Sequence, residues 1–150
     1  MDKTQELHLQ LKSLLESQNL AVLATHRSGQ PYTSLVAFYS TDDLKHIYFV
    51  TPKTTRKFEN LKSDSRVSIL VNSSTNQSDD FHRAVSVTVI GEAIEIVGTE
   101  RQPILQHYLQ KHPHLEDFVR SPSCALVRVS AKSYFMVQNF QNVMELHLSQ

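Results

Sequence analysis

Hydrophobic residues change their spacing several times along the chain, and each spacing predicts a different kind of element. Leucines recur on one side of the segment 4–18, which predicts an amphipathic helix that covers one mouth of the fold. Short apolar runs at 20–25 and 32–40 flank the turn residues 28–31 and predict a β-hairpin. The run 46–50 is rich in β-branched and aromatic residues and predicts a third strand.

A break in the strand spacing follows residue 50. The strand stops at 51–53, and Thr54 or Thr55 is placed to cap a short helix with one apolar side. Apolar and polar residues alternate again at 67–72, which predicts a fourth strand. The polar stretch 73–80 predicts a solvated loop.

The fifth expected strand is longer, and its apolar residues change parity. The valines within 85–89 fall on one parity, whereas Ile94 and Ile96 fall on the other. We therefore expect the inward side to switch near 90–91, through a bulge or sharp bend of the kind that small barrels need in order to close.

The segment 99–110 predicts a second long helix, with two alternative starts. Thr99 and Gln102 resemble a capping box, whereas Pro103 suits a start one turn later. Pro113 then interrupts the helical pattern, because proline lacks the backbone N–H that a helix interior needs.

The remaining pattern predicts a short helical piece at 114–120 and a long final strand at 125–137 that keeps one inward parity. The tail, 139–150, is ambiguous. Six expected strands with short turns, no internal repeat and few helices argue against alternating strand–helix units. The pattern predicts a mainly β fold, an antiparallel six-stranded barrel with peripheral helices.

Length, charge and cysteine content limit the number of domains and the classes of function that this chain can have. A chain of 150 residues suits one domain over 1–150, and its 15 basic and 15 acidic residues leave no global field for nucleic acid. Cys124 stands alone, which excludes an internal disulfide and fits a reducing compartment. No apolar run approaches the ~20 residues needed to span a bilayer, and the start is polar, so we expect a cytoplasmic protein.

The segment 49–61 carries the most specific chemistry. A strand runs directly into a helix start, where unpaired backbone N–H groups favour an anion. Hydroxyl and cationic side chains gather there, and arginine grips two phosphate oxygens at once. With only three glycines the chain has no glycine-rich nucleotide loop. On these residues alone, a phosphate cradle and an ordinary solvated helix face remain alternatives.

The order of these motifs resembles the pyridoxamine 5'-phosphate oxidase-like, FMN-binding split-barrel superfamily. An apolar hairpin, a strand, Thr-x-x-x-Thr-Arg-Lys at 51–57, Asn-Leu at 60–61 and Ser-Arg-Val-Ser-Ile-Leu at 65–70 follow one another, and the likeness runs over about 20–97. The resemblance implies an antiparallel split barrel with Greek-key order. It also implies FMN as the cofactor.

In the oxidase, a threonine at the strand end and a Ser-Arg-Lys triplet at the helix start hold the FMN phosphate. By this resemblance Thr51 takes the place of the threonine, and Thr55, Arg56 and Lys57 take the places of the triplet. The expected cofactor-binding residues are Thr51, Thr55, Arg56, Lys57, Val50, Lys53, Ser34 and Ser86.

This chain also departs from the oxidase. Ser34 and Tyr39 stand where the oxidase has an arginine and a lysine, and Ser86 stands where a glutamine approaches the flavin ring. No counterpart of the C-terminal substrate-binding region is found. The flavin phosphate site is retained and the vitamin substrate site is not, so we expect an FMN-dependent oxidoreductase of another substrate.

The resemblance further implies a homodimer with flavin at the subunit interface, acting on a small molecule or NAD(P)H. Both faces of the second strand are apolar, and its outer face packs either on such a partner or flavin, or under the chain's own helices. A non-catalytic flavin or heme binder and a deazaflavin-dependent reductase are the alternative functions. His107, His112 and His114 form no compact metal motif and are expected on the surface, and Cys124 is expected to be a small buried side chain.

Overall fold

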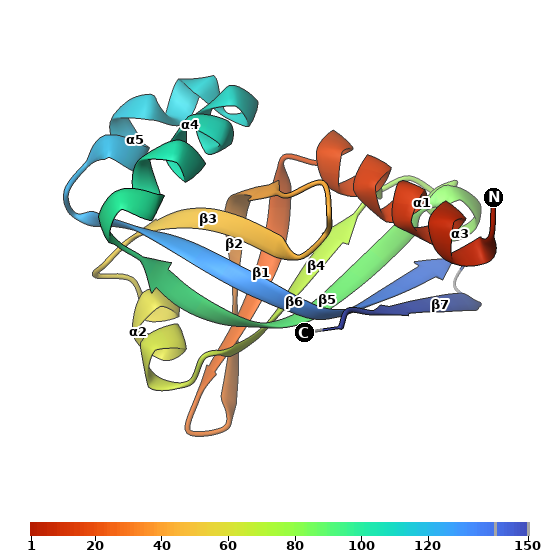
Figure 1. The fold of residues 1–150 in the computed structure, drawn as a ribbon. Helices are drawn as coiled ribbons and strands as arrows, with labels where there is room; N and C mark the ends of the chain where they lie inside the picture. Colours follow the sequence, from red (N-terminus) through yellow and green to blue (C-terminus); the bar gives the residue numbers. More distant parts are fainter. Residues whose placement is uncertain (140, 150) are drawn as a thin grey trace.

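The computed structural model describes residues 1–139 and 141–149 (Figure 1). Its strands are β1 (Leu20–Arg27), β2 (Gln30–Ser40), β3 (His46–Pro52), β4 (Arg66–Asn72), β5 (Val85–Ile96), β6 (Cys124–Gln138) and β7 (Asn142–His147). Its α-helices are α1 (Lys3–Ser17), α2 (Arg56–Ser63), α3 (Asp80–Arg83), α4 (Arg101–Lys111) and α5 (Glu116–Arg120). Short 3₁₀ turns precede α4 (Gly98–Glu100) and α5 (Pro113–Leu115). All the helices and strands expected before the tail are confirmed.

The strands form an antiparallel barrel in the order β3-β2-β1-β4-β5-β6, which closes because β3 also pairs with β6. The first four strands follow the Greek-key order, with β4 beside β1. One edge of β6 carries β3 along 124–130 and β7 along 133–138. The expected six-stranded barrel is therefore confirmed, and β7 adds a strand in the tail that the sequence pattern left undecided. Within that tail, residues 140 and 150 lie outside the described residues.

The expected bulge is confirmed, but the extra residue lies in β6. Ile90 pairs with Ser133 and Gly91 with Ala131, so Lys132 has no partner on β5. The chains approach closely here, because a Cβ added at Gly91 would stand 2.5 Å from the carbonyl oxygen of Ser130. The absence of a side chain at position 91 is what lets β6 fold against β5 at this point.

Because the extra residue lies in β6 and not in β5, the set of side chains that point into the barrel differs from the expected set in both strands. The inward side of β5 does not switch at 90–91, since Ala93 is still buried in the barrel and Ile94 is 53% exposed. The inward side of β6 does switch, because one unpaired residue turns every later side chain to the other face. Tyr134 and Met136 therefore enter the core, not Phe135 and Val137 as the single parity predicted.

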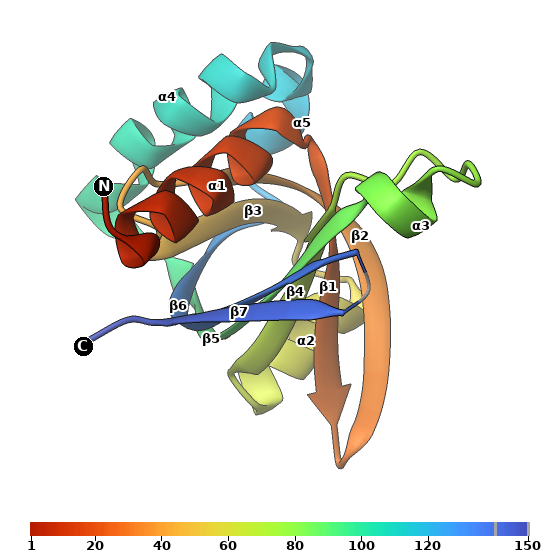
Figure 2. The same ribbon diagram turned by 90° about the vertical axis from the view of Figure 1, so that its right-hand side faces the viewer.

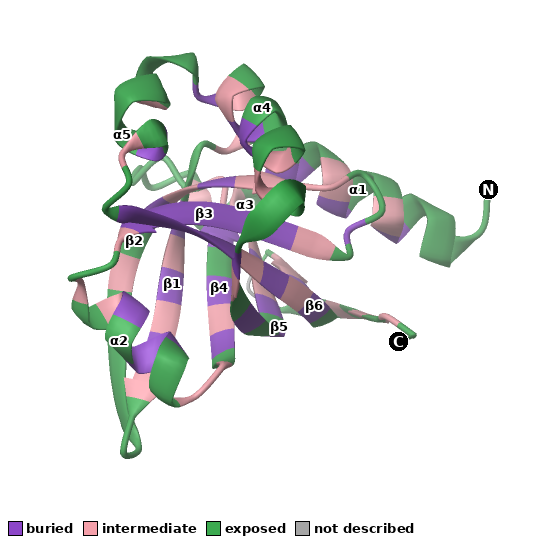
Figure 3. Cartoon of the chain, turned by 60° about the vertical axis from the view of Figure 1, so that its left-hand side comes forward, coloured by how far each residue is buried: buried purple, intermediate pink, exposed green. Residues whose placement is uncertain are grey.

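Two apolar clusters stabilise the molecule (Figure 3). The larger fills the barrel and includes the buried leucines of α1, which lies across one mouth of the barrel as expected (Figures 1 and 2). The smaller lies outside the barrel, between α4, α5 and the outward side of β3, and it holds Ile96. Ile96 is therefore apolar because it packs against helices outside the barrel and not because it points into the barrel.

The start of α4 differs from both expected starts. It begins at Arg101 after a 3₁₀ turn, and its N-cap residue Glu100 makes no side-chain capping hydrogen bond. Gly98, at φ +80°, turns the chain directly into this 3₁₀ turn. Thr99 and Gln102 consequently form no capping box, and Pro103 lies inside the helix.

Helix α4 covers part of the outer face of β2. Tyr108 donates a hydrogen bond of 2.9 Å to the carbonyl oxygen of Ala37, and a ring nitrogen of His112 lies 2.7 Å from that of Phe38. His112 is thus buried, with 2% exposure, which corrects the expectation of a surface histidine. The chain's own helix covers Ala37 on this strand, while Leu35 stays 64% exposed.

Candidate functional site

Strand β3 gives way to helix α2 at residues 51–57, which we call the β3–α2 corner. Pro52 ends the strand, and the backbone N–H of Thr55 donates to its carbonyl oxygen at 3.3 Å. Thr55 is the N-cap of α2, because its Oγ1 accepts from the backbone N–H of Phe58 at 3.4 Å. Of the two expected caps the structure uses Thr55, and the strand-to-helix turn predicted from the sequence is confirmed.

Two threonine hydroxyls meet inside this turn. Thr51 is fully buried, and its Oγ1 lies 2.9 Å from Oγ1 of Thr55. Thr55 Oγ1 also donates to the carbonyl oxygen of Pro52 at 3.0 Å. A hydroxyl proton rotates about the C–O bond, so either hydroxyl is able to redirect its proton toward a bound anion. Backbone groups hold the pair in place, because both hydroxyls contact the carbonyl oxygen of Pro52 and Thr55 Oγ1 also accepts from the N–H of Phe58.

Arg56 and Lys57 follow the pair as the first two residues of α2. Among the described residues neither side chain forms an ion pair, and neither backbone N–H has an acceptor. Both N–H groups lie at the positive end of the helix dipole. Lys57 is half-buried, and this burial lowers the pKa of its ammonium group. The corner therefore presents two cations without an ion pair and two backbone donors without an acceptor, among the residues that the structure describes.

Two other predicted residues, Lys53 and Val50, are less free. Lys53 Nζ lies 3.8 Å from a carboxylate oxygen of Glu95, and Lys62 approaches the same carboxylate at 3.8 Å. Val50 is buried in the apolar cluster under α4, so only its backbone is available to a ligand. Both residues belong to the corner or its border, but their side chains have other partners.

Ser34 lies on the same side of β2 as Val36 and Phe38. Its Oγ is shielded from solvent and has no hydrogen-bond partner among the described residues. A buried hydroxyl without a partner costs about 1 to 3 kcal/mol in general, so it is a group that a ligand acceptor would stabilise. The serine is thus an incompletely satisfied polar position in the barrel wall.

Ser86 lies at the beginning of β5, opposite Asn72 and Val137, whereas α2 leads into the far end of β4. It lines a separate cavity of about 370 Å³ beside the loop that leads to α3. Within one chain, the structure does not bring Ser86 to the β3–α2 corner. Of the expected residues, five lie within the corner, namely Thr51, Lys53, Thr55, Arg56 and Lys57. Val50 directly precedes it, and Ser34 and Ser86 lie on other strands.

A polar cavity of about 430 Å³ adjoins the corner, between the β1–β2 hairpin and α2. The guanidinium of Arg56 enters it and lies 5.3 Å from the ring centroid of Tyr32. Asn60 lines it from the next turn of α2. Sequence reasoning missed Tyr32, which follows the local strand pattern and gives no separate signal, and it noted Asn60 only as part of the motif order, without a binding role.

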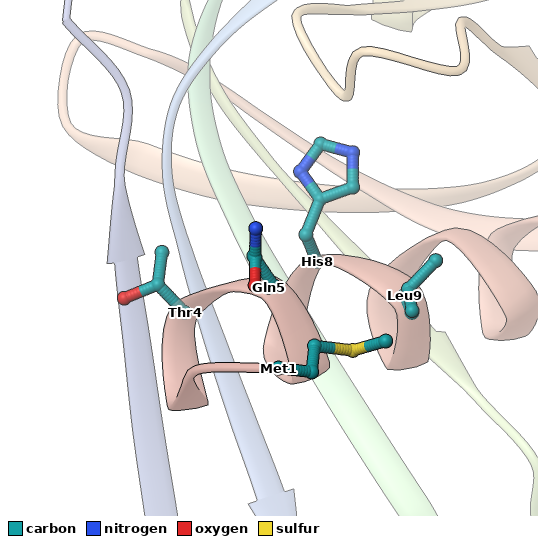
Figure 4. Close-up of a pocket in the computed structure, with 5 residues that line it drawn as sticks. All are labelled: Met1, Thr4, Gln5, His8 and Leu9. Atoms are coloured by element: carbon teal, nitrogen blue, oxygen red, sulfur yellow. The ribbon is translucent and has the colours of Figure 1, made fainter.

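Another hollow, of about 600 Å³, follows one side of α1 (Figure 4). It is lined by Met1, Thr4, Gln5, His8 and Leu9, all from the first nine residues. It offers no lysine or arginine and is mainly apolar, so it has none of the chemistry of a phosphate site. Among the described residues no group of three metal-ligating side chains occurs, and no helix is long and apolar enough to cross a membrane.

The barrel and its corner define a class of protein that comparison identifies. Residues 7–138 match the family described as Pyridoxamine 5'-phosphate oxidase. This chain belongs to that family, and the resemblance seen in its motifs is confirmed. No curated protein matches the sequence.

Solved structures share the fold. A heme binding protein from Mycobacterium smegmatis is 18% identical with a TM-score of 0.83, over 98% of this chain and 59% of that one. A FAD-binding protein from Mesorhizobium loti is 19% identical with a TM-score of 0.67, over 85% and 90%. A protein of Clostridium acetobutylicum, related to general stress protein 26, is 14% identical with a TM-score of 0.75, over 99% and 97%. This chain spans about three-fifths of the Mycobacterium protein.

Proposed function

We propose that this chain binds a flavin through its phosphate at the β3–α2 corner and serves as an FMN-dependent oxidoreductase. The observation that carries the proposal is the set of donors at Arg56 and Lys57 that have no ion-pair or hydrogen-bond partner among the described residues. They lie beside the buried hydroxyl of Thr51 and the half-buried hydroxyl of Thr55. A phosphate dianion needs several donors and at least one positive charge, and the corner has both. Membership of the oxidase family supports the same ligand.

The roles of the corner residues follow from their chemistry. The planar guanidinium of Arg56 suits two phosphate oxygens, while the ammonium of Lys57 supplies a compact charge in a half-buried setting. The two threonine hydroxyls donate the remaining hydrogen bonds. When bound, the flavin supplies hydride transfer at its ring, and the chain holds and orients it.

A second copy of the chain is part of the proposal. The outward side of the sheet carries a row in which Leu35 pairs with Val22 and Val22 with Leu70. Leu35 and Leu70 are 64% and 37% exposed, and exposed apolar patches commonly mark interfaces. Ser86 faces this same outward side of the sheet. A partner packed there would bring Ser86 toward a flavin at the partner's corner, as one chain alone does not.

Heme binding is a second candidate, because the similar protein from Mycobacterium smegmatis is described as heme-binding. The exposed His107 ring stacks on Tyr39, with centroids 6.0 Å apart, beside a cavity of about 280 Å³. Histidine is a common axial ligand of heme iron. His107 lies in α4 and lines a different cavity from Arg56, so flavin binding at the corner and heme binding at His107 can be tested by separate substitutions.

The visible spectrum of the purified chain, followed by titration of the ligand-free protein with FMN, tests the proposal. Flavin absorption bands and saturable FMN binding are expected. A Soret band would favour heme, and a deazaflavin spectrum would favour the third class considered. A colourless protein that does not bind FMN would exclude the proposed function. If the protein does bind flavin, bleaching of the bound flavin by NADH or NADPH in the absence of oxygen would support catalysis.

A further inference from the structure

The polar cavity beside the corner is built from two elements that the barrel brings together. The β1–β2 hairpin contributes Arg27, Gln30 and Tyr32, and the first turns of α2 contribute Arg56, Glu59 and Asn60. The hairpin projects past α2 at the lower end of the barrel (Figure 1). At about 430 Å³ the cavity falls within the usual range for small-molecule sites, about 300 to 1,000 Å³. For brevity we call it the hairpin cavity.

Arg56 joins the hairpin cavity to the β3–α2 corner. Its backbone begins α2 at the corner, while its guanidinium lies over the ring of Tyr32 inside the cavity. A ligand phosphate held by Arg56 therefore has the hairpin cavity as its neighbouring space. Whatever is attached to the far side of that phosphate would enter it.

The charge of the hairpin cavity suits a second phosphate. Arg27 and Arg56 provide two positive charges, and Glu59 provides one negative charge. Arg27 Nη1 and Glu59 Oε2 are 3.8 Å apart and both side chains are exposed, so this contact is weak and exchangeable. The net positive charge remains available to an anion.

The other lining residues of the hairpin cavity suit a base. Tyr32 is 37% exposed, and aromatic rings and guanidinium planes are the surfaces on which bases stack. Asn60 is only 3% exposed, and its Nδ2 donates to Thr25 Oγ1 at 3.1 Å. Its Oδ1 has no hydrogen-bond partner among the described residues, which leaves a nearly buried acceptor at the cavity wall. The exocyclic amine of adenine is a donor of the kind that asparagine amides recognise.

We propose that the hairpin cavity binds the adenylate half of FAD, so that FAD, which contains FMN as its other half, binds more tightly than FMN alone. The inference rests on the proposed function, because it places the FMN part of the molecule at the corner. Arg56 then lies beside the pyrophosphate, Tyr32 stacks on the adenine and Asn60 accepts from its amino group.

The test is a pair of titrations, with FMN and with FAD, on the ligand-free full chain and on variants of the exposed hairpin. The wild type is expected to bind FAD at least about tenfold more tightly than FMN. Tyr32→Ala should weaken FAD binding by about ten- to a hundredfold, the usual worth of one stacked base, and should change FMN binding by less than about threefold. Tyr32→Phe keeps the ring and should retain the FAD preference.

Arg27→Ala should weaken FAD selectively, and Arg83→Ala, an exposed arginine of α3, is its matched control. FAD binding no tighter than FMN, with Tyr32→Ala without effect on either, would overturn the inference and leave the FMN proposal standing. Binding of neither flavin would overturn both. NADH that binds the FMN-loaded protein through Tyr32, while FAD shows no advantage, would assign the cavity to another dinucleotide and also overturn the inference.

Discussion

At the scale of single residues, Lys57 shows how the β3–α2 corner balances charge against burial. Its ammonium is half-buried and has no ion-pair partner among the described residues, so burial lowers its pKa. An anion that docks beside it would supply the missing partner and restore the protonated form. A group in this state stabilises the ligand-free chain little and the ligand complex more.

This gives a pH prediction for FMN binding. The second pKa of a phosphate monoester is about 6, so the phosphate group stays a dianion at alkaline pH. Ionisation of the flavin ring at alkaline pH affects the wild type and a charge-retaining variant alike, so the difference between them reports the protein. The FMN dissociation constant of the wild type should rise as pH increases through the lowered pKa of Lys57. Lys57→Arg keeps its charge and should hold affinity nearly constant over the same range, as measured by fluorescence titration. An equal rise in both proteins would remove Lys57 from the site.

Some residues of the candidate site could be recognised from the sequence and others could not. Thr55 was recognisable as a cap, and Arg56 and Lys57 as candidate phosphate ligands, because the signal of these residues is local to a strand–helix turn. Asn60 and His112 were not, because their burial depends on strands distant in the chain, through Thr25 and Phe38. Local spacing predicts local geometry and is silent on such tertiary partners.

At the scale of elements, the bulge in β6 decides which side chains fill the barrel. Parity predicted the strands correctly, yet it could not say which of two paired strands holds an extra residue. The extra residue in β6 reverses which side chains point into the barrel after Lys132 and brings Tyr134 into the core. There the Tyr134 hydroxyl donates to the carbonyl oxygen of Leu44 at 2.7 Å. The position is enforced by the close approach at Gly91.

Gly91→Ala tests that close approach. The added Cβ would lie 2.5 Å from the Ser130 carbonyl oxygen and 2.9 Å from a methyl of Val129, so one strand must shift. We expect a loss of about 3 kcal/mol in the free energy of unfolding, measured by urea denaturation. The neighbouring exposed substitution Glu92→Ala should cost less than about 1 kcal/mol. Equal midpoints for both variants would contradict the described packing.

Helices α1 and α4 are linked by a partly buried lysine. Lys111 Nζ donates to the carbonyl oxygen of Leu15 at 3.0 Å and lies 4.0 Å from the ring centroid of Phe38. Burial lowers the pKa of Lys111 to about 8, from 10.5 in an unperturbed chain, against an opposing effect of Glu16. Between these values the unfolded chain binds more protons than the folded chain, so the free energy of unfolding rises with pH.

Lys111→Met removes this titration. Compared with the variant, the wild type should gain about 1 to 2 kcal/mol of stability between about pH 7 and pH 10, after allowance for solvent screening. Lys45→Met, at an exposed lysine, controls for the loss of a positive charge. Urea denaturation at several pH values gives the comparison, and a difference that is constant with pH would refute the buried-lysine interpretation.

At the scale of the whole molecule, the barrel was predictable and the completed site was not. Six strands with antiparallel turns left few other architectures, and the Greek-key order followed from the family resemblance. Ser86 lies on the outward face, away from the corner, and only the proposed second copy of the chain would bring it to a flavin site. No pattern within a single sequence specifies that arrangement.

The proposed dimer is testable on the exposed row. Leu35→Glu or Leu70→Asp places a charge on the outward face and should convert a dimer into a monomer in sedimentation experiments, with weaker FMN binding. Leu9→Glu, at a residue of α1 that is 50% exposed, should leave the assembly unchanged. A wild type that stays monomeric at high concentration would exclude this use of the surface.

The central claim is that a phosphate group docks at the β3–α2 corner, and comparison of FMN with riboflavin tests it most directly, because the two ligands differ only by that group. We predict that the wild type binds FMN at least about a hundredfold more tightly than riboflavin. Arg56→Ala should weaken FMN binding by about 1.5 to 3 kcal/mol and leave riboflavin binding unchanged. Equal affinities for the two ligands, or an equal loss of both in Arg56→Ala, would contradict the account.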